Sequence, residues 1–229
     1  MTTTDSSPIA TSEALAQDVE EFLRALAEDN QRFYEDTPEE LRSYWPADLS
    51  PAAAIEALRA RWFNEYIGTI VLARLVDRVE DATLKMLVAR QVGDEAKHAN
   101  VCARRIRELG GRIDDYVPPP EQLAMYDVLD GYVHPEQFLA AMQFTTEHEG
   151  VRRNEAALQR FDAETAQMFA EAINPDEEFH VQIGWIGLRT LCTTSEAQER
   201  ARAACVRQRI LHRDWTKAYR QRMVAAGLA

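Results

Sequence analysis

Two copies of a short motif, Glu-x-x-His, are the residues of this chain best suited to chemistry. They are Glu95 with His98 and Glu177 with His180. Positions three apart lie roughly 300° around a helix, so the two side chains of each motif point to the same side. Carboxylate and imidazole groups on one helix face suit a divalent metal ion such as iron or manganese. One such motif arises easily by chance, and two alone are only suggestive.

The spacing of two further glutamates strengthens the metal-site hypothesis. Glu65 stands 30 residues before Glu95, and Glu147 stands 30 residues before Glu177. A shift of 82 residues therefore lays one Glu…Glu-x-x-His set on the other, and the turns midway fall at residues 80–81 and 162–163. This indicates an internal repeat of a helical hairpin with pseudo-two-fold symmetry. The same shift aligns further identical pairs, among them Gly68 with Gly150, Asp94 with Asp176 and Arg107 with Arg189.

Long helices have to position these residues. Ser50-Pro51 is typical of a helix start and Gly110-Gly111 of a helix end. Residues 112–134 carry three consecutive prolines and predict a long crossover with one short helix near residues 122–129. Apolar residues recurring at spacings of three and four predict helices over about residues 12–34, 51–79, 82–109, 135–161, 164–191 and 195–225.

The expected fold class is all-α, because no segment alternates with the period of two that marks a strand. Four central helices with one long crossover between the second and the third form a ferritin-like four-helix bundle. We expect the additional N-terminal and C-terminal helices to pack outside this bundle.

The candidate ligands fall on the apolar faces of their helices, where an unpaired charge is energetically unfavourable. Burying an ionised carboxylate alone costs several kcal/mol, so such a group is nearly always paired or bound to a metal. The alternative is a buried polar network, or exposed Glu/His pairs, on a plain helical bundle. That alternative gives no reason for the repeated spacing.

The set resembles the ligands of the ferritin-like di-iron carboxylate superfamily. That superfamily uses one Glu from each of two helices and a Glu-x-x-His from each of the other two. The resemblance covers about residues 51–192 and implies that the two motif glutamates bridge two metals. Each outer glutamate would complete one metal with the histidine of its own half. The implied metals are two iron ions, with manganese or a mixed pair as alternatives. The six residues, implied as both metal-binding and catalytic, are Glu65, Glu95, His98, Glu147, Glu177 and His180.

The resemblance implies an activity that depends on the surroundings of the metals. The chain has no four-cysteine rubredoxin module, and its extra helices are similar to those of small-molecule di-iron oxygenases. We therefore predict a non-haem di-iron oxygenase or oxidase. It would activate dioxygen to hydroxylate, N-oxygenate or oxidatively cleave a small organic substrate, with electrons from an external donor. The alternatives are a bacterioferritin-like ferroxidase or iron-storage protein, and a manganese catalase.

A second set of residues is predicted to leave room for oxygen and a substrate beside the metals. Three glycines stand one turn from ligands, and a mid-helix glycine costs about 1 kcal/mol relative to alanine. Close helix packing explains these glycines nearly as well. The expected lining is Trp62, Gly68, Thr69, Gln91, Phe144, Gly150 and Gly184.

Two other features bear on the ligands. Asp94 and Asp176 each precede a motif glutamate, and either accept the second ring N–H of a ligand histidine or are plain surface acids. Asn174-Pro175 predicts a kink or a fresh helix start just before Glu177.

Composition sets the broader limits. The 229 residues are 46% hydrophobic and carry 26 basic against 38 acidic side chains, a net charge of −12. This argues against nucleic acid or an anionic membrane as a partner. Three cysteines form no CxxC pair, which favours a reduced, cytoplasmic setting. We expect a flexible N-terminal tail over residues 1–11 and one helical domain over 12–229, as a monomer or homodimer.

Overall fold

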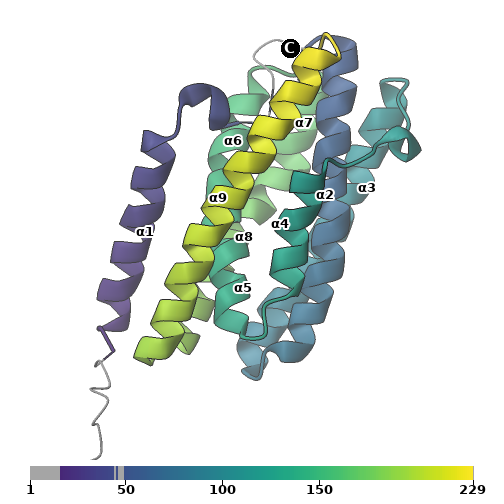
Figure 1. Ribbon diagram of the computed structural model, residues 1–229. Coiled ribbons are helices and arrows are strands. Elements are labelled where there is room, and N and C mark those ends of the chain that lie inside the picture. Colours follow the sequence, from purple (N-terminus) through teal and green to yellow (C-terminus); the bar gives the residue numbers. More distant parts are fainter. Residues whose placement is uncertain (1–15, 44, 46–48, 229) are drawn as a thin grey trace, which may run out of the picture.

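The fold consists of helices throughout the described part of the chain (Figure 1). The computed structural model describes residues 16–43, 45 and 49–228, with the side chains of 156 and 157 excepted. The expected all-α class is confirmed. None of the helices in these ranges is long and apolar enough to cross a bilayer. The elements are α1 (Val19–Asp36), η1 (Glu39–Leu41), α2 (Pro51–Arg78), α3 (Ala82–Glu108), η2 (Ile113–Asp115), α4 (Pro120–Asp130), α5 (Pro135–Ala141), η3 (Met142–Glu147), α6 (His148–Leu158), α7 (Ala163–Met168), η4 (Phe169–Ile173), α8 (Asn174–Leu191) and α9 (Ser195–Ala225).

Side-chain caps begin the long helices where the sequence places them. Ser50 accepts a hydrogen bond from the backbone N–H of Ala53, and Asp81 accepts one from Leu84, so α2 and α3 start with satisfied donors. Asp162 does the same for α7 at the turn of the second hairpin. The first hairpin of the internal repeat is formed by α2 and α3. In the second hairpin, the consecutive segments α5, η3 and α6 form one long helix, and α7, η4 and α8 form the other.

Two π-helical turns distinguish the second hairpin from the first. η3 interrupts the helix that carries Glu147, and η4 ends just before Pro175 in the first turn of α8. The helical backbone runs without a break over residues 163–191, so Pro175 lies inside a continuous helix directly after the π-turn η4. The predicted fresh helix start at this proline is not seen. The matching segments of α2 and α3 are regular α-helix, so the repeat is imperfect in structure.

Helix α9 buries one face against the other helices and exposes the opposite one. It packs against α5, α4 and η3, and the side chains of Trp215 and Tyr219 are fully buried. Two α9 residues, His212 and Trp215, also line an internal cavity beside Glu65 and Glu95. The last helix thus packs beside the third of the four predicted bundle helices and contributes two side chains to the cavity wall.

Candidate metal centre

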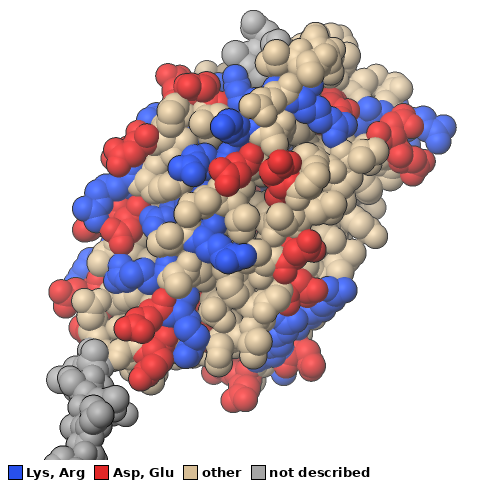
Figure 2. Space-filling view, in the orientation of Figure 1, with Lys and Arg blue, Asp and Glu red and all other residues tan. Residues whose placement is uncertain are grey.

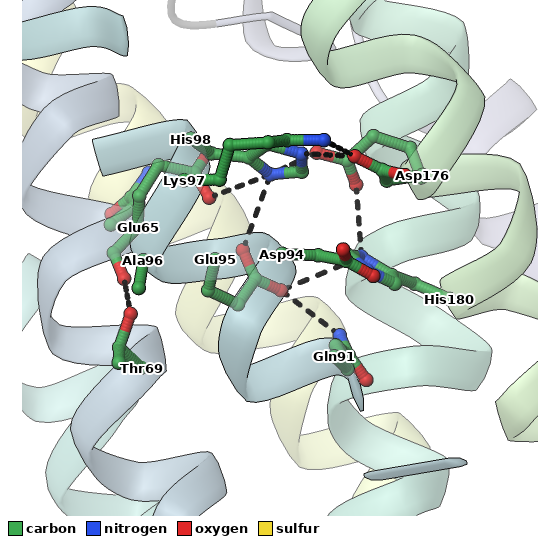
Figure 3. A network of polar contacts seen from close by, with 12 residues as sticks. Glu65, Thr69, Gln91, Asp94, Glu95, Ala96, Lys97, His98, Asp176 and His180 are labelled. Carbon is green, nitrogen blue, oxygen red and sulfur yellow. Dashed lines mark hydrogen bonds and ion pairs between the residues drawn. The ribbon is translucent and has the colours of Figure 1, made fainter. Parts of the chain in front are cut away.

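The structure brings the six predicted ligands together between four helical segments. Glu65 comes from α2, Glu95 and His98 from α3, Glu147 from η3, and the second motif from α8. Every one of the six has an exposed fraction of 7% or less. Figure 3 shows Glu95 between the two histidine rings, whose centroids lie 5.9 Å apart.

The Nδ1 atoms of the two histidines face carboxylate oxygens without forming hydrogen bonds. His98 Nδ1 lies 3.5 Å from Glu65 Oε2 and 3.6 Å from Glu95 Oε2, and His180 Nδ1 lies 3.5 Å from Glu95 Oε1. Both Nδ1 atoms are buried and lack a hydrogen-bond partner within the described ranges. Ligands that share an ion at about 2.1 Å stand roughly 3–3.5 Å apart, so this spacing fits a metal between them.

Two glutamates face both histidines. Glu95 directs one carboxylate oxygen toward each ring, and Glu177 does the same at 3.9 Å on each side. Two groups of potential ligand atoms, each within 4.8 Å of one another, share Glu95. The geometry thus offers two neighbouring metal positions with Glu95 between them and Glu177 slightly further away. The two groups are Glu65, Glu95 and His98, and Glu95, Glu147 and His180.

The second ring nitrogens are held by aspartates in a crossed arrangement. His98 Nε2 on α3 lies 3.1 Å from Asp176 Oδ2 on α8, and His180 Nε2 lies 3.4 Å from Asp94 Oδ2 (Figure 3). An Nε2–H that donates to a carboxylate leaves Nδ1 with a lone pair. Lys97 pairs with Asp176 at the protein surface. Both aspartates therefore orient imidazoles toward the carboxylate cluster.

A glutamine pair orients two of the carboxylates. Gln91 Nε2 donates to Glu95 Oε1 and to Glu147 Oε1, each at 3.0 Å. Gln143 Nε2 in turn donates to Gln91 Oε1 at 2.9 Å. Gln91, which is predicted from the sequence to line a substrate space, thus contacts two of the candidate ligands. The sequence carries no signal that singles out Gln143.

Arg61 is the main functional residue that sequence reasoning missed. It is 8% exposed, and its guanidinium forms ion pairs with Glu65 and with Glu177. Its position four residues before Glu65 on the same helix face was an available signal. In the metal-free protein, Arg61 supplies positive charge to two of the four carboxylates.

Crowding of buried carboxylates changes the proton affinities of the cluster. Burial and the charge of Glu65 raise the pKa of Glu95 to about 7. Burial also raises the pKa of Glu147, with the charges of Glu177 and Glu95 adding to the effect. Burial opposes the charging of His98, but the nearby carboxylates of Glu65 and Glu95 outweigh it and raise the pKa of His98 to about 11. Without metal, the site therefore retains protons that cancel part of its negative charge.

A cavity of about 40 Å³ adjoins the carboxylates and opens to solvent. Residues from α2, α3, α4, η3, α6 and α9 line it, including Asn64, Tyr126, Thr146 and His212. Of the seven residues predicted to line a substrate space, only Gly150 lies on this cavity. A Cβ added at Gly150 would stand 3.9 Å from carboxylate oxygens of Glu147 and Glu177.

The other predicted lining residues have packing contacts. Trp62 stacks on Tyr66, and Phe144 packs against Trp185. The Thr69 hydroxyl donates to the backbone oxygen of Glu65. The two remaining glycines meet the helix of η3: a Cβ at Gly68 would lie 3.6 Å from Met142 Cε, and one at Gly184 would lie 2.9 Å from the backbone N of Phe144.

Comparison with known proteins identifies the fold. No protein-family model matches the chain, and no curated protein matches it. A solved TenA homologue from Pseudomonas syringae pv. tomato has a TM-score of 0.68 at 13% identity, covering 96% of this chain and all of that one. A TenA homologue from Pyrococcus furiosus has a TM-score of 0.69 at 11% identity, covering 86% and 99%. A domain of unknown function with a heme oxygenase-like fold, from Shewanella denitrificans, has a TM-score of 0.68 at 12% identity, covering 92% and 96%.

These neighbours bear on two predictions. The fold is the all-helical heme oxygenase-like arrangement, and the ferritin-like bundle is not confirmed. The prediction of a di-iron oxygenase or oxidase, with its ferroxidase and catalase alternatives, is wrong. It depended on the ferritin-like resemblance, whereas the solved neighbours are TenA homologues and a domain with a heme oxygenase-like fold. The physical reason is that a Glu…Glu-x-x-His pattern specifies ligand spacing along helices, which different helical folds can supply.

Proposed function

We propose that this chain is a metalloprotein that binds two divalent metal ions between α2, α3, η3 and α8 and uses them to act on a small molecule. The observation that carries the proposal is the pair of buried imidazole Nδ1 atoms. Each faces carboxylates and lacks a hydrogen-bond partner in the described structure. Buried polar atoms without partners are rare unless a ligand, ion or water satisfies them.

The charge and chemistry of the donor set support a pair of ions. Four buried carboxylates carry a formal charge of −4, which two divalent cations neutralise. Mixed nitrogen and oxygen ligands suit iron, and also manganese or a mixed pair. Glu65 and His98 would hold one ion, Glu147 and His180 the other, with Glu95 and Glu177 between them. Bound ions of this kind supply Lewis acidity toward a substrate or water.

The residues around the ions have roles of their own. The crossed aspartates hold both imidazoles in one tautomer and orientation. Gln91 fixes the carboxylates of Glu95 and Glu147 relative to each other. The adjoining cavity gives a small molecule access to the carboxylate side of the cluster.

Metal stoichiometry tests this proposal. Purified protein is stripped with chelator, loaded anaerobically with Fe²⁺ or with Mn²⁺, desalted and analysed for metal. We expect two ions per chain, and less than one for Glu95→Gln, which removes a charge shared by both positions. The matched control is Glu178→Gln on α8, an exposed glutamate beside Glu177, which should keep two. One ion or fewer in the wild type, or an unchanged content in Glu95→Gln, would reject the dinuclear site.

A further inference from the structure

A second pocket lies on the outer side of the metal cavity. It is formed between α1, the segment after it, η3, α6 and α9, has an internal volume of about 40 Å³ and opens to solvent. Three residues, Thr146, Arg153 and His212, line both this pocket and the cavity beside the metal ligands. We name it the outer pocket. Its position makes it a neighbour of the candidate metal centre, separated from it by those three side chains.

The outer pocket is strongly basic. Four arginines line it, against one acidic residue, Glu149. Basic side chains also follow α1 and α9 on the face drawn in Figure 2, with acidic ones interspersed. A cluster of guanidinium groups around partly enclosed space attracts anions, and a guanidinium binds carboxylate or phosphate oxygens in a planar fork. The four arginines are Arg42, Arg153, Arg209 and Arg213.

Two aromatic rings hold these guanidinium groups in place and give the pocket an apolar wall. The guanidinium carbons of Arg209 and Arg213 lie 5.2 Å and 5.8 Å from the centroid of the Phe33 ring. Arg42 lies 5.5 Å from the centroid of Tyr34. Cations within about 6 Å of a ring centroid are attracted to its face. The same rings offer flat apolar surface to the body of a bound molecule.

Several buried polar atoms of the outer pocket have no partner among the described residues. They comprise a donor, Arg209 Nε, the acceptors Asn30 Oδ1 and both oxygens of Glu149, and the ring nitrogen His212 Nε2. Asn30 is 3% exposed, and its amide nitrogen is already used in a 3.1 Å hydrogen bond to Thr145 Oγ1. Only its carbonyl oxygen is therefore available to a ligand. Unsatisfied buried groups of this kind are destabilising in a native structure unless something binds them.

We propose that the outer pocket binds a small organic anion: a carboxylate or phosphate group on a flat apolar body that carries a hydroxyl or amino group. Arg209 holds the anionic group, Phe33 and Tyr34 contact the body, and Asn30 accepts the hydrogen bond of the hydroxyl or amino group. Binding in the outer pocket requires no metal. That the bound molecule serves the metal centre follows from the shared wall and rests on the proposed function.

Calorimetry on the metal-free full-length chain tests the outer pocket independently of the metal site. The probes are 4-hydroxybenzoate and phenyl phosphate, with the neutral 4-hydroxybenzamide and inorganic phosphate for comparison. We expect saturable binding of at least one organic anion, with the neutral amide and inorganic phosphate each weaker by about tenfold or more. Arg209→Gln should weaken the organic anion by a similar factor. The matched control, Arg207→Gln, changes an exposed arginine two residues away that does not line the pocket and should leave binding unchanged.

Several results would overturn the proposal. They are no saturable binding of either organic anion, equal binding of the neutral amide, equal binding of inorganic phosphate, or an unaltered affinity in Arg209→Gln. If Arg209→Gln fails to fold, Arg213→Gln replaces it, and the comparison of anion with amide needs no variant. Loss of metal binding in the stoichiometry experiment would remove the role beside the metals and leave the anion site intact.

Discussion

Gly184 on α8 provides a sharp test of how the two halves of the site are packed. A Cβ at this position would stand 2.9 Å from the backbone N of Phe144, 3.0 Å from the backbone C of Gln143 and 3.1 Å from Gln143 Cβ. Two of these atoms belong to the backbone of η3, so the π-turn itself has to move. Gly93 on α3 is the matched control, because a Cβ there meets nothing within 4 Å among the described residues.

The expected changes in the free energy of unfolding have opposite signs for the two substitutions. Overpacking costs about 1–3 kcal/mol, and alanine in a helix recovers about 0.5–1 kcal/mol relative to glycine. Gly184→Ala should therefore lower the free energy of unfolding by about 1–2 kcal/mol, whereas Gly93→Ala should raise it by about 0.5–1 kcal/mol. For a chain of this size each kcal/mol shifts Tm by about 2–4 °C. We therefore expect Tm to fall by about 2–8 °C in Gly184→Ala and to rise by about 1–4 °C in Gly93→Ala.

Thermal unfolding of the metal-free variants, followed by circular dichroism, measures both shifts. Because Glu147 lies in the displaced π-turn, Gly184→Ala should also weaken metal binding beside His180. A Gly184→Ala protein as stable as Gly93→Ala would refute the packing argument. It would favour the original interpretation of Gly184 as a residue that leaves room for a substrate.

Three further predictions concern the metal centre. Asp176→Asn should weaken binding of the ion beside His98 by about 10–100-fold, and Asp94→Asn should weaken binding of the ion beside His180 by a similar factor. Competition with a chelating dye measures both affinities. Equal loss of both ions in either variant would contradict separate roles for the two aspartates. Arg61→Met removes the guanidinium that pairs with two buried carboxylates, so the metal-free protein should lose about 3–5 kcal/mol of stability, and bound metal should restore part of it. Denaturant unfolding with and without Mn²⁺ measures this, and an equal loss under both conditions would contradict the prediction. Metal-free protein holds protons that ligation displaces, since the pKa of His98 is raised to about 11 and that of Glu95 to about 7. Lower pH therefore favours the metal-free form. Calorimetry at pH 7 in buffers of different ionisation enthalpy should find that metal binding releases protons. Net proton uptake on metal binding would contradict this prediction.

Much of the fold follows from local sequence signals. Ser50, Asp81 and Asp162 mark helix starts that the structure confirms. The proline-rich crossover and its short helix are also present, as α4. Local signals do not specify how helices assemble, which is why the heme oxygenase-like arrangement was missed. That arrangement depends on contacts between residues far apart in the chain, such as those of α9 with α5.

The candidate site was predictable to the extent that it depends on spacing along helices. The 82-residue shift aligns the six expected residues and also aligns Asp94 with Asp176. That each aspartate contacts the histidine of the other half is seen only in the structure. Glu177 stands further from the histidines than its counterpart Glu95. The π-turn just before α8 and the ion pair of Glu177 with Arg61 distinguish the second half from the first, and no periodic pattern reports either.

Anomalous diffraction from crystals loaded with Fe²⁺ tests the central claim most directly. Data collected above and below the iron absorption edge locate iron without reference to any expected geometry. Two peaks are predicted: one bounded by Glu65, Glu95 and His98 Nδ1, the other by Glu95, Glu147 and His180 Nδ1. A single peak, or peaks elsewhere with Arg61 still paired to Glu65 and Glu177, would contradict the dinuclear centre.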